Sequence, residues 1–250
     1  MWNNVRQLNC ATSALYALLL FGCTAAGCYW LTQHPAFALR TILIYGDTEH
    51  INAPTVRAGV VWRLKGNFFT VDLDTARVAF EQMSWVHHAS VRRVWPNTLT
   101  VMLEEYKPLG TWGSDQLVST DGELFIANQG EFDEELPSFD GPDGSAKEVV
   151  QRYRDFTKWF VPLGSAPKAV TLSSRYAWMV KLANGTEIEF GRERNGDTLP
   201  DRAQRLVDAW PTVTHRWGKD IEYADLRYPN GFAIRAANVP FLNDTEKANK

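Results

Sequence analysis

The hydrophobic positions begin with one long uninterrupted run. Residues 11–31, ATSALYALLLFGCTAAGCYWL, carry no charge, and the nearest charged side chains are Arg6 and Arg40. As an α-helix this run is about 31 Å long, which matches the ~30 Å hydrocarbon core of a bilayer. Tyr29 and Trp30 stand at its end, where aromatic side chains favour the membrane–water interface. The pattern predicts a transmembrane helix over 11–31 after a cytoplasmic tail over 1–10.

Two other interpretations of this run stay open. The small residues Thr24-Ala25-Ala26 could end a cleaved signal peptide, and Cys23 or Cys28 could end a lipoprotein signal. The run is long for a signal peptide, and neither cysteine follows a good lipobox. A short leading tail favours translocation of the chain beyond the helix, so we expect the N-terminus in the cytoplasm and the body outside.

Residues 39–106 show the order strand, helix, helix, strand, strand. Period-2 and period-3.6 spacings of apolar residues alternate along this segment, with capping residues before each helix. The expected elements are a strand over Leu39–Tyr45, a helix from Asn52 to Gly66, a helix after the cap Asp72, and a hairpin of Val86–Trp95 with Leu99–Leu103. This order predicts a small α+β domain.

Residues 107–240 have a more β-rich pattern with two helices. Three turn signals predict hairpins, and two Ser/Thr-x-x-acid sequences predict helix starts with capping boxes. The turns are Asp121-Gly122, Asn184-Gly185 and Pro229-Asn230-Gly231, and the helix starts are Ser145/Glu148 and Thr198/Asp201. We expect a loop over 128–144, a helix kinked or shortened at Pro211, and a disordered tail over 241–250.

Composition narrows the functional classes. The chain is 45% hydrophobic and 22% charged with a net charge of −3, so no basic excess favours a nucleic-acid partner. Its three cysteines, Cys10, Cys23 and Cys28, leave the body free of thiols, which fits an oxidising compartment.

Motifs for catalysis are weak. Ser165-x-x-Lys168 lacks the companion motifs of a penicillin-recognising enzyme, and His87-His88 are adjacent on a strand, which prevents joint chelation. We therefore expect no enzyme activity, no metal, no cofactor and no small-molecule substrate. A binding function is favoured, and the last strand, Phe232–Ala236, could accept an extended partner segment if it forms a sheet edge. A covered or central strand is the alternative.

Taken together, the motifs resemble one known family. Val91-Arg-Arg-Val-Trp-Pro-Asn97, Leu117-Val-x-x-Asp-Gly122, Gly141-Pro-x-Gly-Ser-Ala146 and Tyr223-x-Asp-Leu-Arg-Tyr228-x-x-Gly231 are similar, in order and spacing, to the FtsQ/DivIB family of cell-division proteins. The resemblance covers nearly the whole chain. It implies a single transmembrane helix, a POTRA domain (β-α-α-β-β) over 39–106 and a second mixed, β-rich domain with two helices over 107–240.

The resemblance also implies a role and a location. Members of the family are non-enzymatic, single-pass type II proteins of the bacterial inner membrane, with the body in the periplasm at the division septum. They act as divisome scaffolds that recruit FtsB, and FtsL through FtsB, and so link early to late division proteins for septal peptidoglycan synthesis. Further partners implied are FtsK, FtsN, FtsW and FtsI.

Carried over by position, the resemblance assigns two sets of site residues. The FtsB-binding residues are Arg175, Arg227, Tyr228, Asn230, Gly231 and Phe232, and the POTRA residues for recruitment are His88, Val91 and Arg93. The residue types suit this role, because arginine offers planar charge to carboxylates, tyrosine a rigid anchor and glycine close backbone approach. This chain has Arg235-Ala236 where family members often have Gly-Trp.

Two other functional classes compete with this expectation. A peptidoglycan-acting envelope enzyme should show converging acidic residues in a concave site. A POTRA-bearing secretion or assembly factor should show tandem POTRA units or a downstream barrel.

Overall fold

A computed structural model describes residues 5–32, 34–128, 130, 132, 135–194, 196–218 and 221–236 of the 250-residue chain. The chain divides into two compact units, residues 1–105 and 106–250. Each unit has its own sheet and its own hydrophobic core, and the two are described separately. The expected tail over 241–250 lies outside the described residues.

The first unit begins with the helix α1, Val5–Thr32. Its segment Asn9–Thr32 is long and apolar enough to cross a membrane, and its apolar stretch is not buried within the protein. Large apolar side chains such as Leu18 and Phe21 are exposed along it. A water-soluble helix would hide such residues against a core, so α1 is a candidate membrane span.

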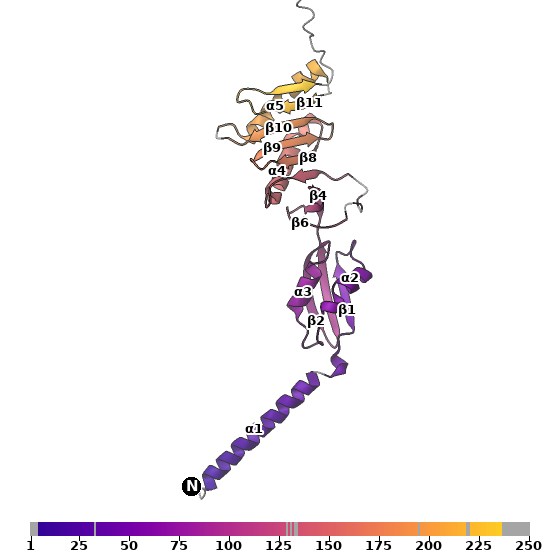
Figure 1. The fold of residues 1–250 in the computed structure, drawn as a ribbon, viewed down its shortest axis with the longest axis vertical. Helices are drawn as coiled ribbons and strands as arrows, with labels where there is room; N and C mark the ends of the chain where they lie inside the picture. Colours follow the sequence, from indigo (N-terminus) through magenta and orange to yellow (C-terminus); the bar gives the residue numbers. More distant parts are fainter. Residues whose placement is uncertain are drawn as a thin grey trace, which may run out of the picture. The chain divides into compact units, whose positions relative to one another are not determined.

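The rest of the first unit is a three-stranded sheet with helices (Figure 1). Its order is β1-β3-β2, with β1 parallel and β2 antiparallel to β3. The elements are η1 (Pro35–Phe37), β1 (Thr41–Gly46), α2 (Ala53–Gly59), η2 (Val61–Arg63), α3 (Leu73–Glu81), β2 (Val86–Val94) and β3 (Thr98–Glu105). Alternate residues of β3, Leu99, Val101 and Leu103, are fully buried, as the period-2 pattern predicted.

The prediction of a helix from Asn52 to Gly66 is wrong about where the helix ends. Asn52 does cap α2, because its side chain accepts a hydrogen bond from the N–H of Thr55. However, α2 ends at Gly59, and a short 3₁₀ turn, η2, follows. Three consecutive β-branched or bulky residues, Val60, Val61 and Trp62, disfavour helix continuation there.

In its described residues, the second unit is a nine-stranded mixed sheet with two α-helices. Its strand order is β12-β11-β10-β9-β8-β7-β4-β5-β6. The strands are β4 (Pro108–Trp112), β5 (Gln116–Ser119), β6 (Leu124–Phe125), β7 (Ser138–Asp140), β8 (Pro167–Leu172), β9 (Ala177–Leu182), β10 (Glu187–Arg192), β11 (Ile221–Asp225) and β12 (Ala233–Ala236).

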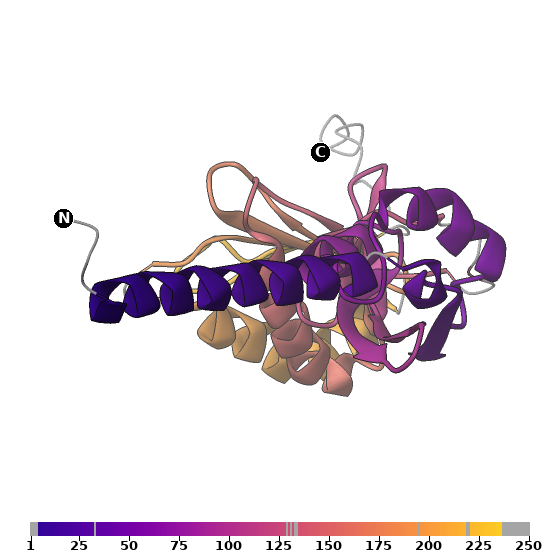
Figure 2. The same ribbon diagram turned by 90° about the horizontal axis from the view of Figure 1, so that it is seen from below.

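Helices α4 (Ala146–Trp159) and α5 (Leu199–Trp217) lie side by side along this sheet (Figure 2), and the short turn η4 (Val161–Leu163) follows α4. The core between helices and sheet contains Phe156 and Phe160 beside Phe190 of β10. Thr198 and Asp201 form the expected capping box at the start of α5. The predicted α+β fold class is confirmed.

Three expectations for this unit need correction. Residues 128–144 are not loop throughout, because Ser138–Asp140 forms β7 between β4 and β8. Ser145 does not form a capping box: its backbone is helical (φ −87°, ψ 0°), and its hydroxyl donates to the carbonyl of Pro142 at 2.6 Å. Pro211 does not shorten α5, which continues to Trp217 because Trp210 and Val213 pack into the core on either side.

Candidate protein-binding site

The last strand of the second unit lies at an edge of its sheet. β12 pairs antiparallel with β11, with Ala224 opposite Ile234, and the described residues place no strand on its other side. Arg235 bends back over β11, where its Nε is 3.2 Å from Glu222 Oε2 and its guanidinium lies 5.4 Å from the Tyr223 ring. The outer backbone groups of β12 can therefore accept an added strand.

A side chain of α5 forms hydrogen bonds with the turn between β11 and β12. Arg205 Nη1 donates to the carbonyls of Tyr228, at 2.9 Å, and Gly231, at 3.3 Å. Its Nη2 donates to Asp197 Oδ1 at 2.8 Å. One arginine thus fixes both ends of the segment Tyr228-Pro-Asn-Gly231.

Asp197 joins this turn to a buried arginine. Arg202 is only 1% exposed, and its Nε lies 2.8 Å from Asp197 Oδ2. Its Nη1 donates to the carbonyls of Phe190 and Arg192 at the end of β10. Desolvation alone would raise the pKa of Asp197, but the hydrogen bonds from Arg205 and Arg202 outweigh it and hold that pKa below its ordinary value.

Arg227 is committed to carboxylates of its own chain. Its Nε and Nη2 form a fork on Asp225, at 2.9 and 2.7 Å, and its Nη1 lies 2.9 Å from Glu189 Oε1. The hydrogen bond from Arg227 lowers the pKa of Asp225, and Asp225 in turn raises the pKa of Arg227. The Arg227 guanidinium therefore stabilises the chain before the β11–β12 turn, and it is not a free cation.

Tyr223 completes the cluster on β11. Its hydroxyl donates to Glu189, and burial together with that bond raises the pKa of Tyr223 to about 12. Tyr223 therefore stays neutral and donates over the physiological range.

The register brings the FtsB-binding positions implied by the resemblance to one end of the sheet. Ala177 of β9 pairs with Arg192, and Glu189 of β10 pairs with Asp225. The turn carrying Arg175, the end of β10 and the β11–β12 turn therefore share one end. A groove of about 440 Å³ lies there, lined by Ala177, Glu189, Gly191, Arg192, Glu193, Arg194, Arg202 and Arg227.

The six residues are not equivalent within this end. Arg175 is exposed and forms no ion pair or hydrogen bond among the described residues. Tyr228 is 54% exposed, and Asn230 is exposed in the turn. Phe232 is half-buried against the main core. Arg175 and Tyr228 are thus the two large side chains most available to a partner.

The three POTRA positions lie on β2, which is an edge strand of the first unit's sheet. His88 Nδ1 is 3.1 Å from Glu81 Oε1, and Arg93 donates to the carbonyl of Val71 at 2.5 Å. Val91 is half-buried and packs on the core. The structure places the three on one strand, but only His88 and Arg93 are exposed.

The sequence interpretation missed the arginine–aspartate cluster under the hairpin. A signal was present, because Arg202 lies three residues after Leu199 and four before Leu206, on the buried face of α5. A charged residue at a core position indicates a buried, paired ion. Asp225 and Arg227 likewise stand at spacing i, i+2, at the end of β11 and just after it.

Within the described residues, these features define a class: a protein with one candidate membrane span, a small unit with a three-stranded sheet, and a β-rich unit that ends in an exposed sheet edge. Comparison with known proteins assigns the family. Residues 37–106 match the POTRA domain, FtsQ-type, and residues 110–227 match the C-terminal domain of cell division protein FtsQ/DivIB.

Three relatives described as cell division protein FtsQ are similar along nearly their full lengths. The Burkholderia pseudomallei protein is 79% identical over 250 residues, covering 100% of both chains. The Bordetella pertussis protein is 44% identical over 96% of this chain and 94% of its own. The Coxiella burnetii protein is 30% identical over 94% and 95%. The chain belongs to the FtsQ/DivIB family of cell-division proteins.

Proposed function

We propose that this chain is a non-enzymatic, bitopic scaffold of the divisome that recruits FtsB, and FtsL through FtsB, in the periplasm. In this role it links early to late division proteins at the septum, with FtsK, FtsN, FtsW and FtsI as further partners. The N-terminus lies in the cytoplasm, α1 crosses the inner membrane, and the rest of the first unit and the second unit face the periplasm.

The observation that carries the proposal is the exposed edge strand β12 beside a rigid turn. Arg205 and Asp197 fix the turn before a partner arrives, so little ordering entropy is lost on binding. An FtsB segment adds to β12 as a further strand, through backbone hydrogen bonds. Arg175 contacts an acidic group of the partner, and Tyr228 packs on an apolar one.

Arg227 has a different role in this proposal from Arg175. The Nε and Nη2 groups of Arg227 already donate to Asp225, so Arg227 positions the adjacent backbone of Tyr228. Its remaining N–H groups donate to the partner. The recruitment residues His88, Val91 and Arg93 act on the separate edge strand β2, which keeps the two partner surfaces independent.

The experiment is binding of the full-length chain, in detergent, to the periplasmic segment of its FtsB. Arg175→Glu and Tyr228→Ala should each weaken binding by about 2 kcal/mol, or roughly 30-fold, as expected for interface hot spots. Matched controls are Lys158→Glu on α4 and Trp95→Ala in the first unit, which change an exposed cation and an exposed aromatic elsewhere.

Thermal unfolding of all four variants should equal that of the parent chain, because none of the side chains is buried. Unchanged FtsB binding by both Arg175→Glu and Tyr228→Ala would reject the site. Absence of FtsB binding by the parent chain would reject the proposed function.

A further inference from the structure

The first unit carries an unbalanced basic surface close to α1. Residues 33–46 and 51–71 contain no aspartate or glutamate, but they contain Arg40, Arg57, Arg63 and Lys65. The whole chain has a net charge of −3, so this local excess runs against the overall balance.

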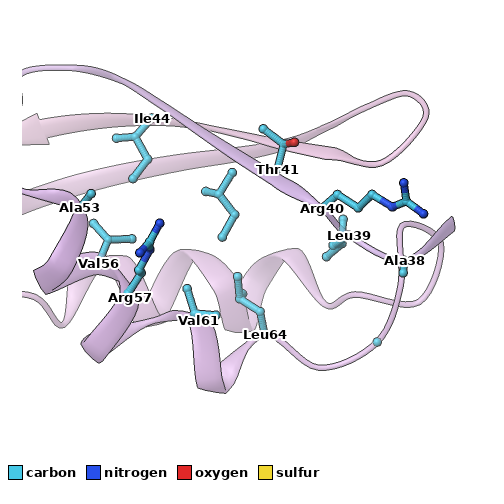
Figure 3. A pocket seen from close by; sticks show the side chains of 12 residues that line it. Ala38, Leu39, Arg40, Thr41, Ile44, Ala53, Val56, Arg57, Val61 and Leu64 are labelled. Atoms are coloured by element: carbon cyan, nitrogen blue, oxygen red, sulfur yellow. The ribbon is translucent and has the colours of Figure 1, made fainter. Parts of the chain in front are cut away.

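Two of these cations line one groove, and the other two are close in sequence to residues that line it. A groove of about 630 Å³ runs between β1 and the α2–η2 segment (Figure 3). Arg40 and Arg57 line it, and Leu64 and Gly66, the neighbours of Lys65, line it too. Arg63 follows Val61, which also lines it, by two residues. The four residues therefore lie in or next to the walls of this groove.

The charges are not neutralised within the described part of the chain. Arg40, Arg57 and Lys65 form no ion pair there. Arg63 donates to the neutral side chain of Gln82, and its guanidinium lies 4.9 Å from the Trp62 ring. Four positive charges are thus available to an external anionic surface.

Exposed aromatic residues accompany the cations. Trp62 is 64% exposed and Phe69 is 46% exposed. The Phe69 ring stacks edge-on against Phe37 with centroids 5.0 Å apart. Aromatic side chains next to arginine and lysine are typical of surfaces that lie at a membrane interface.

Contacts hold this surface near the end of α1. Asn67 donates through its side chain to the carbonyl of Thr32, the last residue of α1. The N–H of Phe68 donates to the carbonyl of Phe37 at 2.9 Å. The link between Thr32 and Arg40 is at most about 28 Å long even when fully extended. The surface therefore stays within reach of whatever surrounds the end of α1.

We infer that Arg40, Arg57, Trp62, Arg63, Lys65 and Phe69 form a docking surface, here called the basic patch, for anionic phospholipid headgroups of the bilayer that α1 spans. The inference rests on the membrane anchoring of the proposed function but not on FtsB binding. Tethering by α1 makes the encounter intramolecular, so weak individual contacts suffice. Each basic residue near an anionic surface strengthens association about fivefold.

The test is hydrogen exchange of the full chain in lipid nanodiscs. One disc type contains phosphatidylglycerol with phosphatidylethanolamine, and the other contains phosphatidylcholine alone. Amides of residues 57–69 should exchange several-fold more slowly in the anionic discs, whereas those of β2 should exchange equally in both. Salt at ~0.5 M should abolish the difference, because screening shortens the reach of surface charges.

Charge reversal provides the matched comparison. Arg57→Glu with Lys65→Glu should remove the lipid-dependent protection, whereas Lys107→Glu with Lys158→Glu, an equal change at exposed positions outside the patch, should preserve it. Equal exchange of residues 57–69 in both disc types would overturn the inference, as would protection that appears only with an added protein partner.

The same samples separate the two proposals. Incorporation into discs reports on anchoring by α1, and FtsB binding by the doubly reversed variant reports on the second unit. If the doubly reversed variant loses lipid-dependent protection but still binds FtsB, the lipid contact is assigned to the basic patch. Loss of FtsB binding in the parent chain would contradict the proposed function and leave the lipid comparison interpretable.

Discussion

In the first unit Arg40 and Arg57 face solvent beside β1 without an ion pair among the described residues. In the second unit Arg202, Arg205 and Arg227 each contact a carboxylate of the same chain. The surface beside β1 and the cluster under the β11–β12 turn thus use one residue type in opposite ways. Arginines that are paired internally shape a surface, whereas unpaired ones are available to bind.

This difference also separates the two arginines implied by the resemblance. Arg175 and Arg227 lie at the same end of the nine-stranded sheet, but only Arg227 has its planar fork occupied by Asp225. We therefore propose Arg175, which forms no ion pair among the described residues, rather than Arg227 as the main charged contact with a partner.

The largest expected effect is the loss of stability on removal of Arg202, the most buried arginine of the cluster. Arg202→Ala leaves Asp197 with one partner and strips two backbone carbonyls of their donor. Removal of one partner of a buried ion pair costs about 3–5 kcal/mol. Chemical denaturation should show this loss, whereas Arg175→Ala should change the free energy of unfolding by less than about 0.5 kcal/mol. Equal effects would erase the distinction between the two kinds of arginine.

A second change tests the edge of β12. In an antiparallel pair, alternate residues point their N–H groups outward, so either Ile234 or Arg235 presents a donor to an added strand. Proline there removes the donor. One of Ile234→Pro and Arg235→Pro should lower FtsB affinity at least about fivefold while the protein stays folded, because each lost backbone bond is worth about 1 kcal/mol or more. Full binding by both folded variants would contradict strand addition.

A smaller effect concerns acid stability. The pKa of Asp225 is lowered in the folded state, so its contribution is present above its unfolded pKa, about 3.9, and is lost as pH falls through the folded value. Asp197 behaves in the same direction. Asp225→Asn should therefore make stability less dependent on pH below about pH 4. Denaturation curves between about pH 2 and 7 measure this, and an unchanged slope would contradict the Arg227–Asp225 fork.

The smallest effect is expected at Arg235. Its pair with Glu222 is exposed on both sides, and exposed pairs contribute about 0–1 kcal/mol. Arg235→Ala should lower stability by no more than this in the same denaturation assay. A loss above about 2 kcal/mol would show that β12 depends on this pair to stay on the sheet.

The sequence predicted the elements with strong local signals. Alternation along Leu99, Val101 and Leu103 indicated β3, and the Thr198/Asp201 capping box indicated the start of α5. It also anticipated the edge position of the last strand as one of two alternatives. Local signals suffice where the determining contacts lie within a few residues.

Elements set by distant contacts were not predictable in this way. β7 is three residues long and exists because it pairs in parallel with β4 and β8. Ser145 carried the sequence of a capping box, but a helical backbone turned its hydroxyl to Pro142 instead. The cluster around Asp197 joins α5 to β10 and to the last turn, so no single segment contains its pattern.

The proposed function depends above all on strand addition at β12, and hydrogen exchange of the full chain with and without the periplasmic segment of FtsB probes that step without any substitution. Saturating FtsB should slow exchange of the outward-facing amides in β12 (Ala233–Ala236) and leave β2 (Val86–Val94) unchanged. Saturated FtsB binding with no change of exchange in β12 would contradict strand addition.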